Sequence, residues 1–301
     1  MAGAAAQDTG PDALAGIAAL PGVPEAVEAA RAACEELRWH EAYRRRWRGV
    51  RAEATVRSAR SSAALEGARV PLEVVRAMLV GAPPAGGQEH LVALGALRAG
   101  AHVERLMPDL GARGATRLPP FAQLVAGVHS AAAAGWLPDE QLGRLRLDDG
   151  PADLRGLGPA VTGPELAARL DLLGQVVRDT TAPALVVAAV AHGELLTLRP
   201  FAAGNGVVAR AVARLLLTAR GLDPTGSLVA EAAWAPAANP YLGAAAGFAT
   251  GAPEGVARWV QVCAEAAVEG AARARDIADA VLAGRLDGGP LDGGRSDAGR
   301  G

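Results

Sequence analysis

The chain has 301 residues, a formal net charge of −2 at pH 7 and a hydrophobic content of 50%. This length and composition allow a sizeable core, and the near-neutral charge provides no basic field to favour nucleic acid or an anionic membrane as a partner. Aromatic residues make up only 3% of the chain, so alanine, leucine and valine supply most of the apolar surface. That mixture favours closely packed helices over a β-sandwich and predicts an all-α fold.

The N-terminal part is predicted to contain a loose end followed by helices. Residues 1–22 are rich in alanine, glycine and aspartate, lack the basic region of a signal peptide, and are expected to be flexible. Residues 23–85 are expected to form an N-terminal helical region. Within it, helical spacing is sustained over 24–67 and resumes over 71–81, where a proline opens the helix and a glycine follows it.

Residues 86–284 are expected to form the core domain. Apolar periodicity predicts helices over 88–106, 120–134, 162–178, 182–198, 206–220 and 253–283, with short helical pieces in 224–250. Between them, residues 143–163 are rich in glycine, proline and aspartate and fit either a β-hairpin or an irregular loop. The low-complexity tail, 285–301, is expected to be disordered.

The cysteines and the most apolar run indicate the cellular compartment in which the protein is expected. Cys34 and Cys263 lie far apart and neither belongs to a Cys-x-x-Cys motif or a Cys/His cluster, so buried reduced thiols are favoured over a disulfide or a metal pair. The most apolar run, 182–196, is interrupted by His192, Gly193 and Glu194 before it could cross a bilayer. A cytoplasmic protein without a membrane partner is therefore expected.

The stretch LRPFAAGNGVVAR, residues 198–210, has the pattern of an anion site. A Gly-Asn-Gly turn runs into a helix, whose first N–H groups lack partners and whose dipole favours negative charge. Glycine lets a phosphate approach the backbone, and Arg210 lies one turn into the helix, where its guanidinium could bind phosphate or carboxylate in a bidentate manner. Taken alone, the pattern fits a helical corner with a surface arginine equally well.

Residues 199–210 resemble the motif of the Fic (Fido) family, HPFx(D/E)GNGRxxR. The matching positions are Pro200, Phe201, Gly204, Asn205, Gly206 and Arg210. A second stretch, SSAALEG at residues 61–67, is similar to the inhibitory motif (S/T)xxxE(G/N) of the subclass whose autoinhibitory helix precedes the core, with Ser62, Glu66 and Gly67 filling it. Together the motifs extend the resemblance over roughly residues 40–270.

The resemblance implies an α-helical fold and an activity that transfers AMP from ATP to a protein hydroxyl. In the family pattern a histidine is the general base, an acidic residue binds magnesium, the Gly-Asn-Gly turn holds phosphates and two arginines clamp the nucleotide. A flap beside the site aligns the target peptide, which implies a protein partner at residues 143–163. The inhibitory glutamate pairs with the second arginine, which implies a regulatory pair of Glu66 and Arg210, with Ser62 beside them.

Three positions depart from the family pattern. Arg199 stands at the position of the base, and a guanidinium cannot accept a proton near neutral pH. Ala203 replaces the metal-binding carboxylate, so magnesium is not expected, and Val207 replaces the first arginine. We therefore predict a site that is inactive for standard AMP transfer, with no required cofactor. Gly204, Asn205, Gly206 and Arg210 remain as candidate ligands of an ATP-like nucleotide or a phosphate, and Arg199 is a further candidate positive charge.

Other polar residues are interpreted as structural or as parts of the surface. His192 lies on an inner helix face, ~10 Å along the axis from Arg199, and is expected to be structural, as are His40, His90, His102 and His129 unless they lie at the surface. The run Arg44–Arg48 is interpreted as a solvated helix face. Glu66 also fits a solvated charge at a helix end.

Three hypotheses for the function follow. The favoured one is a Fic-fold pseudoenzyme that retains an anion pocket and acts by binding. The alternatives are an active transferase with altered chemistry, in which Arg199 holds an acidic or phosphorylated group, and a structural helical interaction module whose pocket is vestigial.

Overall fold

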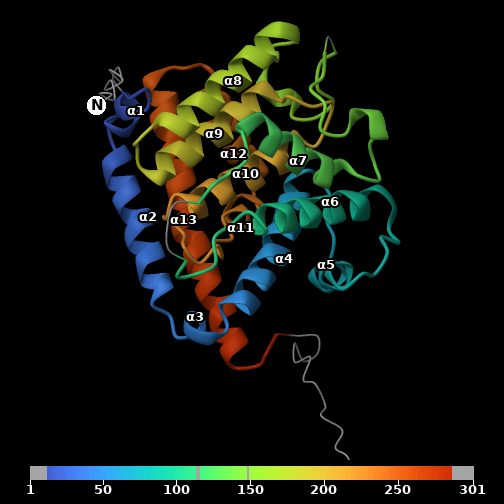
Figure 1. The fold of residues 1–301 in the computed structure, drawn as a ribbon, viewed down its shortest axis with the longest axis vertical. Helices are drawn as coiled ribbons and strands as arrows, with labels where there is room; N and C mark the ends of the chain where they lie inside the picture. Colours follow the sequence, from blue (N-terminus) through green and yellow to red (C-terminus); the bar gives the residue numbers. More distant parts are fainter. Residues whose placement is uncertain (1–11, 113–115, 148, 287–301) are drawn as a thin grey trace, which may run out of the picture.

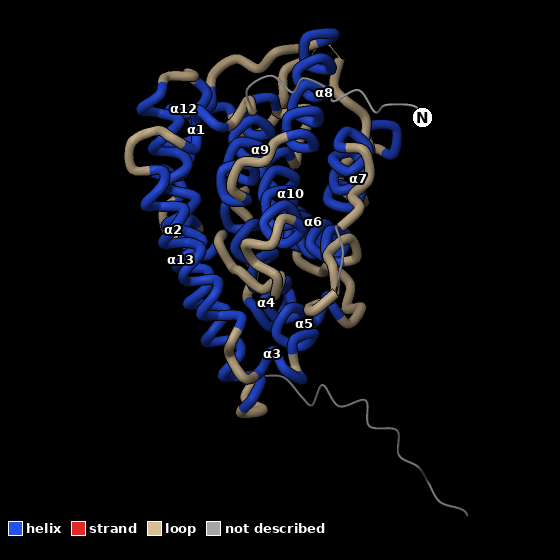
Figure 2. Tube along the Cα trace, turned by 60° about the vertical axis from the view of Figure 1, so that its left-hand side comes forward, coloured by secondary structure: helices blue, strands red, loops and turns tan. Residues whose placement is uncertain are grey.

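The computed structural model describes residues 12–112, 116–147 and 149–286 (Figure 1). Over these ranges the regular secondary structure is helical and contains no β-strand, with one isolated bridge between Ala134 and Leu137. Figure 2 shows the same arrangement of helices and loops. The predicted all-α class is thus confirmed, while the expectations for residues 1–11 and 287–301 fall outside the described residues.

The helical spacing over 24–67 is divided among three helices instead of one. The N-terminal helices are α1 (Ala15–Ala18), α2 (Val23–Arg38), α3 (Ala42–Arg45), α4 (Trp47–Leu65) and α5 (Leu72–Leu79). The chain turns after α2, and within this turn the backbone N–H of Ala42 donates a hydrogen bond to Nδ1 of the His40 ring, at 3.3 Å. No proline or glycine marks this break.

Residues 12–22, expected to be flexible, are packed on the helical body. Leu14 is buried, and the Asp12 carboxylate accepts hydrogen bonds from the hydroxyls of Thr180 and Thr181 and from the Thr181 N–H. These bonds hold the pKa of Asp12 well below its usual range. A single acidic side chain thus attaches this segment to the turn before α9.

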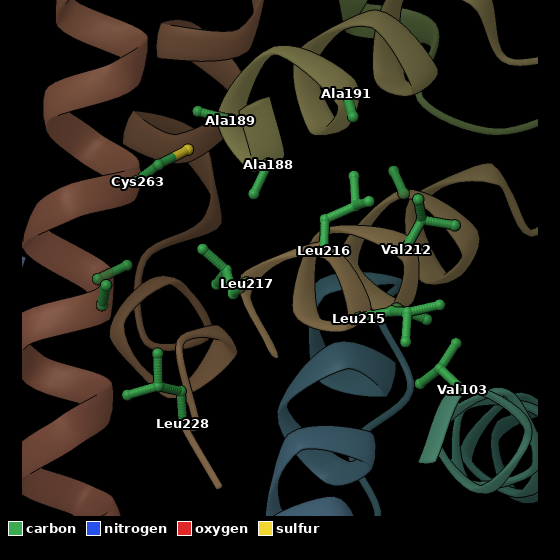
Figure 3. Close-up of a cluster of buried hydrophobic side chains, with 14 of the residues drawn as sticks. Val103, Ala188, Ala189, Ala191, Val212, Leu215, Leu216, Leu217, Leu228 and Cys263 are labelled. Carbon is green, nitrogen blue, oxygen red and sulfur yellow. The ribbon is translucent and has the colours of Figure 1, made fainter. Parts of the chain in front are cut away.

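The remaining helices include a central antiparallel pair, which the others surround. They are α6 (Gly87–Glu104), α7 (Phe121–Ala133), α8 (Gly163–Asp179), α9 (Ala184–Leu198), α10 (Asn205–Ala219), α11 (Glu231–Trp234), α12 (Ala238–Ala249) and α13 (Pro253–Leu282). Apart from His192, Glu194 and Thr197, helix α9 is apolar, as expected for a helix enclosed by others. It packs against α10, and Figure 3 shows Ala188 and Ala191 of α9 facing Val212 and Leu216 of α10.

The helices of the N-terminal region pack directly against those of residues 86–284. Helices α2 and α13 lie side by side in Figures 1 and 2, and their contacts advance in the same direction: Gln261 donates to the Pro21 carbonyl, and Arg275 pairs with Glu36. Helix α4 packs against α6, α11 and α13, with its C-terminal end close to the start of α10. This arrangement brings the two sequence motifs together.

Of the two structures proposed for residues 143–163, the irregular loop is found and the hairpin is not. Apart from Asp148, which lies outside the described residues, the segment contains a short 3-10 turn, Arg155–Leu157, and no strand. Its backbone is bonded to the motif instead: the N–H of Arg146 donates to Pro200 and that of Ala152 to Ala202. None of the helices described reaches the combination of length and hydropathy needed to cross a membrane.

Candidate functional site

The Gly-Asn-Gly turn links α9 to α10 through a side chain that closes the loop on itself. Gly204 adopts the left-handed conformation, with φ 81°, and is followed by Asn205 at the first position of α10. The Asn205 amide accepts from the N–H of Phe201 and donates to the Phe201 carbonyl, both at 2.9 Å. These two bonds of the Asn205 side chain therefore fix the shape of the turn.

A carboxylate of the chain lies at the N-terminus of α10. The backbone N–H of Asn205 donates to Asp153 at 2.8 Å, and its side-chain Nδ2 donates to the other carboxylate oxygen at 2.7 Å. Burial raises the pKa of Asp153, the charge of Glu66 adds to that effect, and the bonds from Asn205 oppose it. No sequence motif marks Asp153, because its contacts depend on how the loop folds back onto the turn.

Arg210 is enclosed by residues from the end of α4. Its guanidinium donates to the Ser62 hydroxyl at 2.9 Å, to the Ser62 carbonyl at 3.1 Å and to the Glu66 carboxylate at 2.6 Å. The Arg210 side chain is 1% exposed and that of Glu66 is 13% exposed. Burial alone would lower the pKa of Arg210, but the interactions with Glu66 and Tyr241 outweigh it and the pKa is raised.

The absence of a side chain at Gly206 makes this pairing sterically feasible. A Cβ at this position would lie 2.2 Å from Glu66 Oε1 and 3.0 Å from Arg210 Nη1. Such distances are far below van der Waals contact, so glycine leaves the space that the Glu66 carboxylate occupies. Two motifs far apart in sequence thus meet at one point.

Arg199 points into the loop and bonds to its backbone. Its guanidinium donates to the carbonyls of Leu154 at 2.9 Å and Gly158 at 2.7 Å. Arg146 is also buried, and it donates to the carbonyls of Leu198, Arg199 and Val161. Burial lowers the pKa of both guanidinium groups.

His129, expected to be structural or at the surface, packs directly on the motif. Its ring stacks on Phe201 with a centroid distance of 3.8 Å. Because Nδ1 accepts from the Gly143 N–H at 2.9 Å, the proton lies on Nε2, which donates to the Ala203 carbonyl at 3.1 Å. Burial lowers the pKa of His129 to about 4, although the bond to Ala203 opposes the shift. The neutral ring therefore joins the loop to the turn.

His192 lies in an enclosed aromatic group behind Arg210. Its Nε2 is 2.8 Å from the Tyr241 hydroxyl, and its ring centroid lies 5.5 Å from that of Trp234 and 5.0 Å from that of Trp259. Burial lowers the pKa of His192 to about 3, with a smaller contribution from the Arg210 charge. The His192 ring is thus enclosed in the core, 1% exposed.

These two histidines predict a loss of stability on mild acidification. Each stays neutral in the fold at pH 5, whereas in the unfolded chain each binds a proton near pH 6.5. Unfolding therefore takes up protons, and each histidine should remove about 2 kcal/mol of stability between pH 7 and pH 5. Denaturant unfolding at both pH values tests this, with His129→Gln as the variant: its destabilising effect should shrink by that amount at pH 5. An effect independent of pH would contradict the assignment.

The other candidate positions contribute no reactive groups. Ala203 and Val207 provide methyl groups, and Val207 is buried. Cys34 and Cys263 are free and buried. Within the described part of the chain, no group of three or more histidine, cysteine, aspartate or glutamate residues is placed to hold a metal ion. A cavity of about 30 Å³ adjoins Arg210 and His192, which is room for water and not for a nucleotide.

Solved structures resemble this arrangement of helices, whereas no protein-family model and no curated protein matches the sequence. A Fic family protein from Desulfovibrio desulfuricans G20 superimposes with a TM-score of 0.66 at 20% identity, covering 83% of this chain and 74% of that one. Fic-1 from C. elegans gives 0.63 at 18% identity, covering 87% and 73%. A Fic domain containing signaling protein from Bacteroides thetaiotaomicron VPI-5482 gives 0.64 at 13% identity, covering 84% and 98%. The similarity extends over more than four fifths of this chain in each case, and this chain has the Fic fold.

Proposed function

We propose that this Fic-fold protein binds an anionic ligand of the phosphate class at the Gly204–Asn205–Gly206 turn and does not transfer AMP by the standard route. The observation that carries the proposal is the bonding of Asn205, whose N–H groups converge on a carboxylate at the start of α10. A helix N-terminus that holds one anion has the polarity to hold another. Arg210, one turn further along, would supply the fork for a phosphate group.

The residues at the reactive positions support the loss of standard chemistry. Arg199 cannot serve as a base, and its guanidinium is bonded to the carbonyls of Leu154 and Gly158. Loss of a general base typically costs ~10²- to 10⁴-fold in rate, and loss of an arginine that stabilises phosphoryl charge ~10³- to 10⁵-fold. The effects are not additive, yet either one removes most of the family's activity. We infer a pseudoenzyme that acts by binding.

The contact of Glu66 with Arg210 supports a regulatory role for the end of α4. The Glu66 carboxylate is bonded to the Arg210 guanidinium, which a phosphate would need. Ser62 also bonds to this guanidinium. A ligand that binds Arg210 must therefore compete with Glu66. We propose that movement of this helix end controls access to the site. The loop at 143–163, where Leu147 is 73% exposed, is the proposed surface for a protein partner.

Calorimetric titration with ATP, without magnesium, tests the proposal. The wild-type protein should bind weakly, and Glu66→Gly should strengthen binding about 10- to 100-fold, the value of one competing hydrogen bond to a charged group. Added magnesium should change little, because the phosphate charge is met by N–H groups and arginine. The control is Glu66→Gly with Arg210→Gln, which removes both members of the pair and leaves no buried charge unpaired. This double variant should lose binding. Absence of ATP and phosphate binding in the folded Glu66→Gly variant, and also in that variant with Asp153→Asn, would refute the proposal.

A structural interaction module is the second candidate function. The observation in its favour is that residues of the chain itself occupy both anion-binding groups, Asp153 on Asn205 and Glu66 on Arg210. In that case the bonds only stabilise the fold. The same titration separates the two candidates, since a module with a vestigial pocket binds no nucleotide in any variant.

A further inference from the structure

The loop over the motif is held in place at unusual conformational cost. In the described part of the chain, Leu154 and Arg199 are the non-glycine residues with positive φ, at 52° and 44°. A left-handed conformation costs a bulky residue about 1–3 kcal/mol and persists where surrounding contacts enforce it. These two residues are bonded to each other, since the Arg199 guanidinium donates to the Leu154 carbonyl. The strain lies immediately beside Asp153.

Two buried arginines hold the loop in this conformation by hydrogen bonds to its backbone. Arg146 reaches the carbonyls of Asp149 and Val161, on either side of Asp153 in the loop, while Arg199 reaches Leu154 and Gly158 between them. Both guanidinium groups therefore bind backbone carbonyls where a carboxylate partner would be usual. Their donors fix the path of the loop, and this path delivers Asp153 to the turn.

Asp153 makes the contacts that an anionic ligand of the turn would make. Its two oxygens accept the backbone N–H and the side-chain Nδ2 of Asn205. The carboxylate is half-buried, and Glu66 nearby carries the same charge. Two like charges around one turn disfavour each other, so the arrangement depends on the bonds from Asn205 and on the arginines that hold the loop.

We propose that Asp153 is the chain's own ligand for the anion site, and that Arg199, at the position where the family pattern has histidine, is a positioning residue that holds the loop bearing Asp153. An external phosphate binds when Asp153 leaves Asn205. This inference rests on the proposed anion binding and adds to it: the site is closed twice, by Glu66 on Arg210 and by Asp153 on Asn205. At the position where the family pattern has a base, this chain therefore has a residue that holds the loop in place.

The test compares ATP binding and loop exchange in the Glu66→Gly background, where Arg210 is free. Asp153→Asn keeps the shape of the side chain and removes its charge. Arg199→Asn removes the guanidinium and retains a residue type that tolerates positive φ, so it serves as a second variant should the first fail to fold. Asp149→Asn is the matched control. It removes the same charge from the same loop, but the Asp149 side chain is exposed and does not contact Asn205.

Asp153→Asn should tighten ATP binding about 10-fold to 100-fold, the range for hydrogen bonds to a charged group. It should also speed amide hydrogen exchange of residues 149–158. Arg199→Asn should act in the same direction, and Asp149→Asn should leave the affinity unchanged. If Glu66→Gly binds ATP and Asp153→Asn adds nothing, Asp153 is only a helix cap and this inference fails while anion binding stands. Equal tightening by Asp149→Asn also overturns it. If no variant binds ATP, the proposed function itself fails.

Discussion

Restoring the family residues should bring back AMP transfer. The variant Arg199→His, Ala203→Asp, Val207→Arg and Glu66→Gly supplies the base, the metal-binding carboxylate and the first arginine, and frees Arg210. Transfer of radiolabel from ATP to protein should rise at least ~10²-fold above the wild-type background, the smaller value of a general base. Histidine suits position 199 structurally, because it tolerates the positive φ of that residue better than most side chains.

The control for this repair is the same variant with Arg199 left in place. It has the restored carboxylate and arginine but no base, and it should stay at the background. A repaired protein that keeps its helical circular dichroism and binds ATP without transferring AMP would show that the chain has lost the geometry of the reaction. A repaired protein that neither binds nor transfers would favour the structural module.

Breaking the Arg210–Glu66 contact from the arginine side should have the largest effect on stability. Arg210→Met leaves Glu66, whose side chain is 13% exposed, without its partner, and removal of one member of a buried pair typically costs about 3–5 kcal/mol. Denaturant unfolding measures the loss. In the Glu66→Gly background the same substitution should cost less, because no charge is left unpaired, and the double-mutant cycle gives the difference.

The matched control for that prediction is Arg169→Met. Arg169 pairs with Glu194 at 2.8 Å, but the side chains are 38% and 25% exposed. A solvated pair of this kind contributes about 0–1 kcal/mol. Equal losses for the two substitutions would contradict the description of Arg210 and Glu66 as a buried pair.

Much of the fold could be predicted from local sequence signals, and the exceptions have physical causes. Apolar periodicity and flanking glycine or proline located α6, α7, α8, α9, α10 and α13 closely. The division of residues 24–67 was missed, because no proline or glycine marks the turn in which Ala42 bonds to the His40 ring. The attachment of residues 12–22 was also missed, since it depends on one aspartate meeting a distant pair of threonines.

The candidate site could be predicted only where a motif defined it. The turn residues and the meeting of Glu66 with Arg210 followed from two patterns in family order. Asp153 had no such pattern: it lies in a loop with other aspartates, and only the folded path shows which one reaches Asn205. Arg199 was expected to face the anion, whereas its long side chain turns to the carbonyls of the loop. His129 gave no signal because its neighbours on α7 are apolar and its partners are remote in sequence.

A crystal structure of the Glu66→Gly variant soaked with ATP in the absence of magnesium tests the central claim most directly. The account predicts phosphate density at the start of α10, within hydrogen-bond distance of the Asn205 N–H and the Arg210 guanidinium, with Asp153 displaced from Asn205. Asp153 still bonded to Asn205, with no nucleotide at the turn or with nucleotide bound elsewhere, would contradict it.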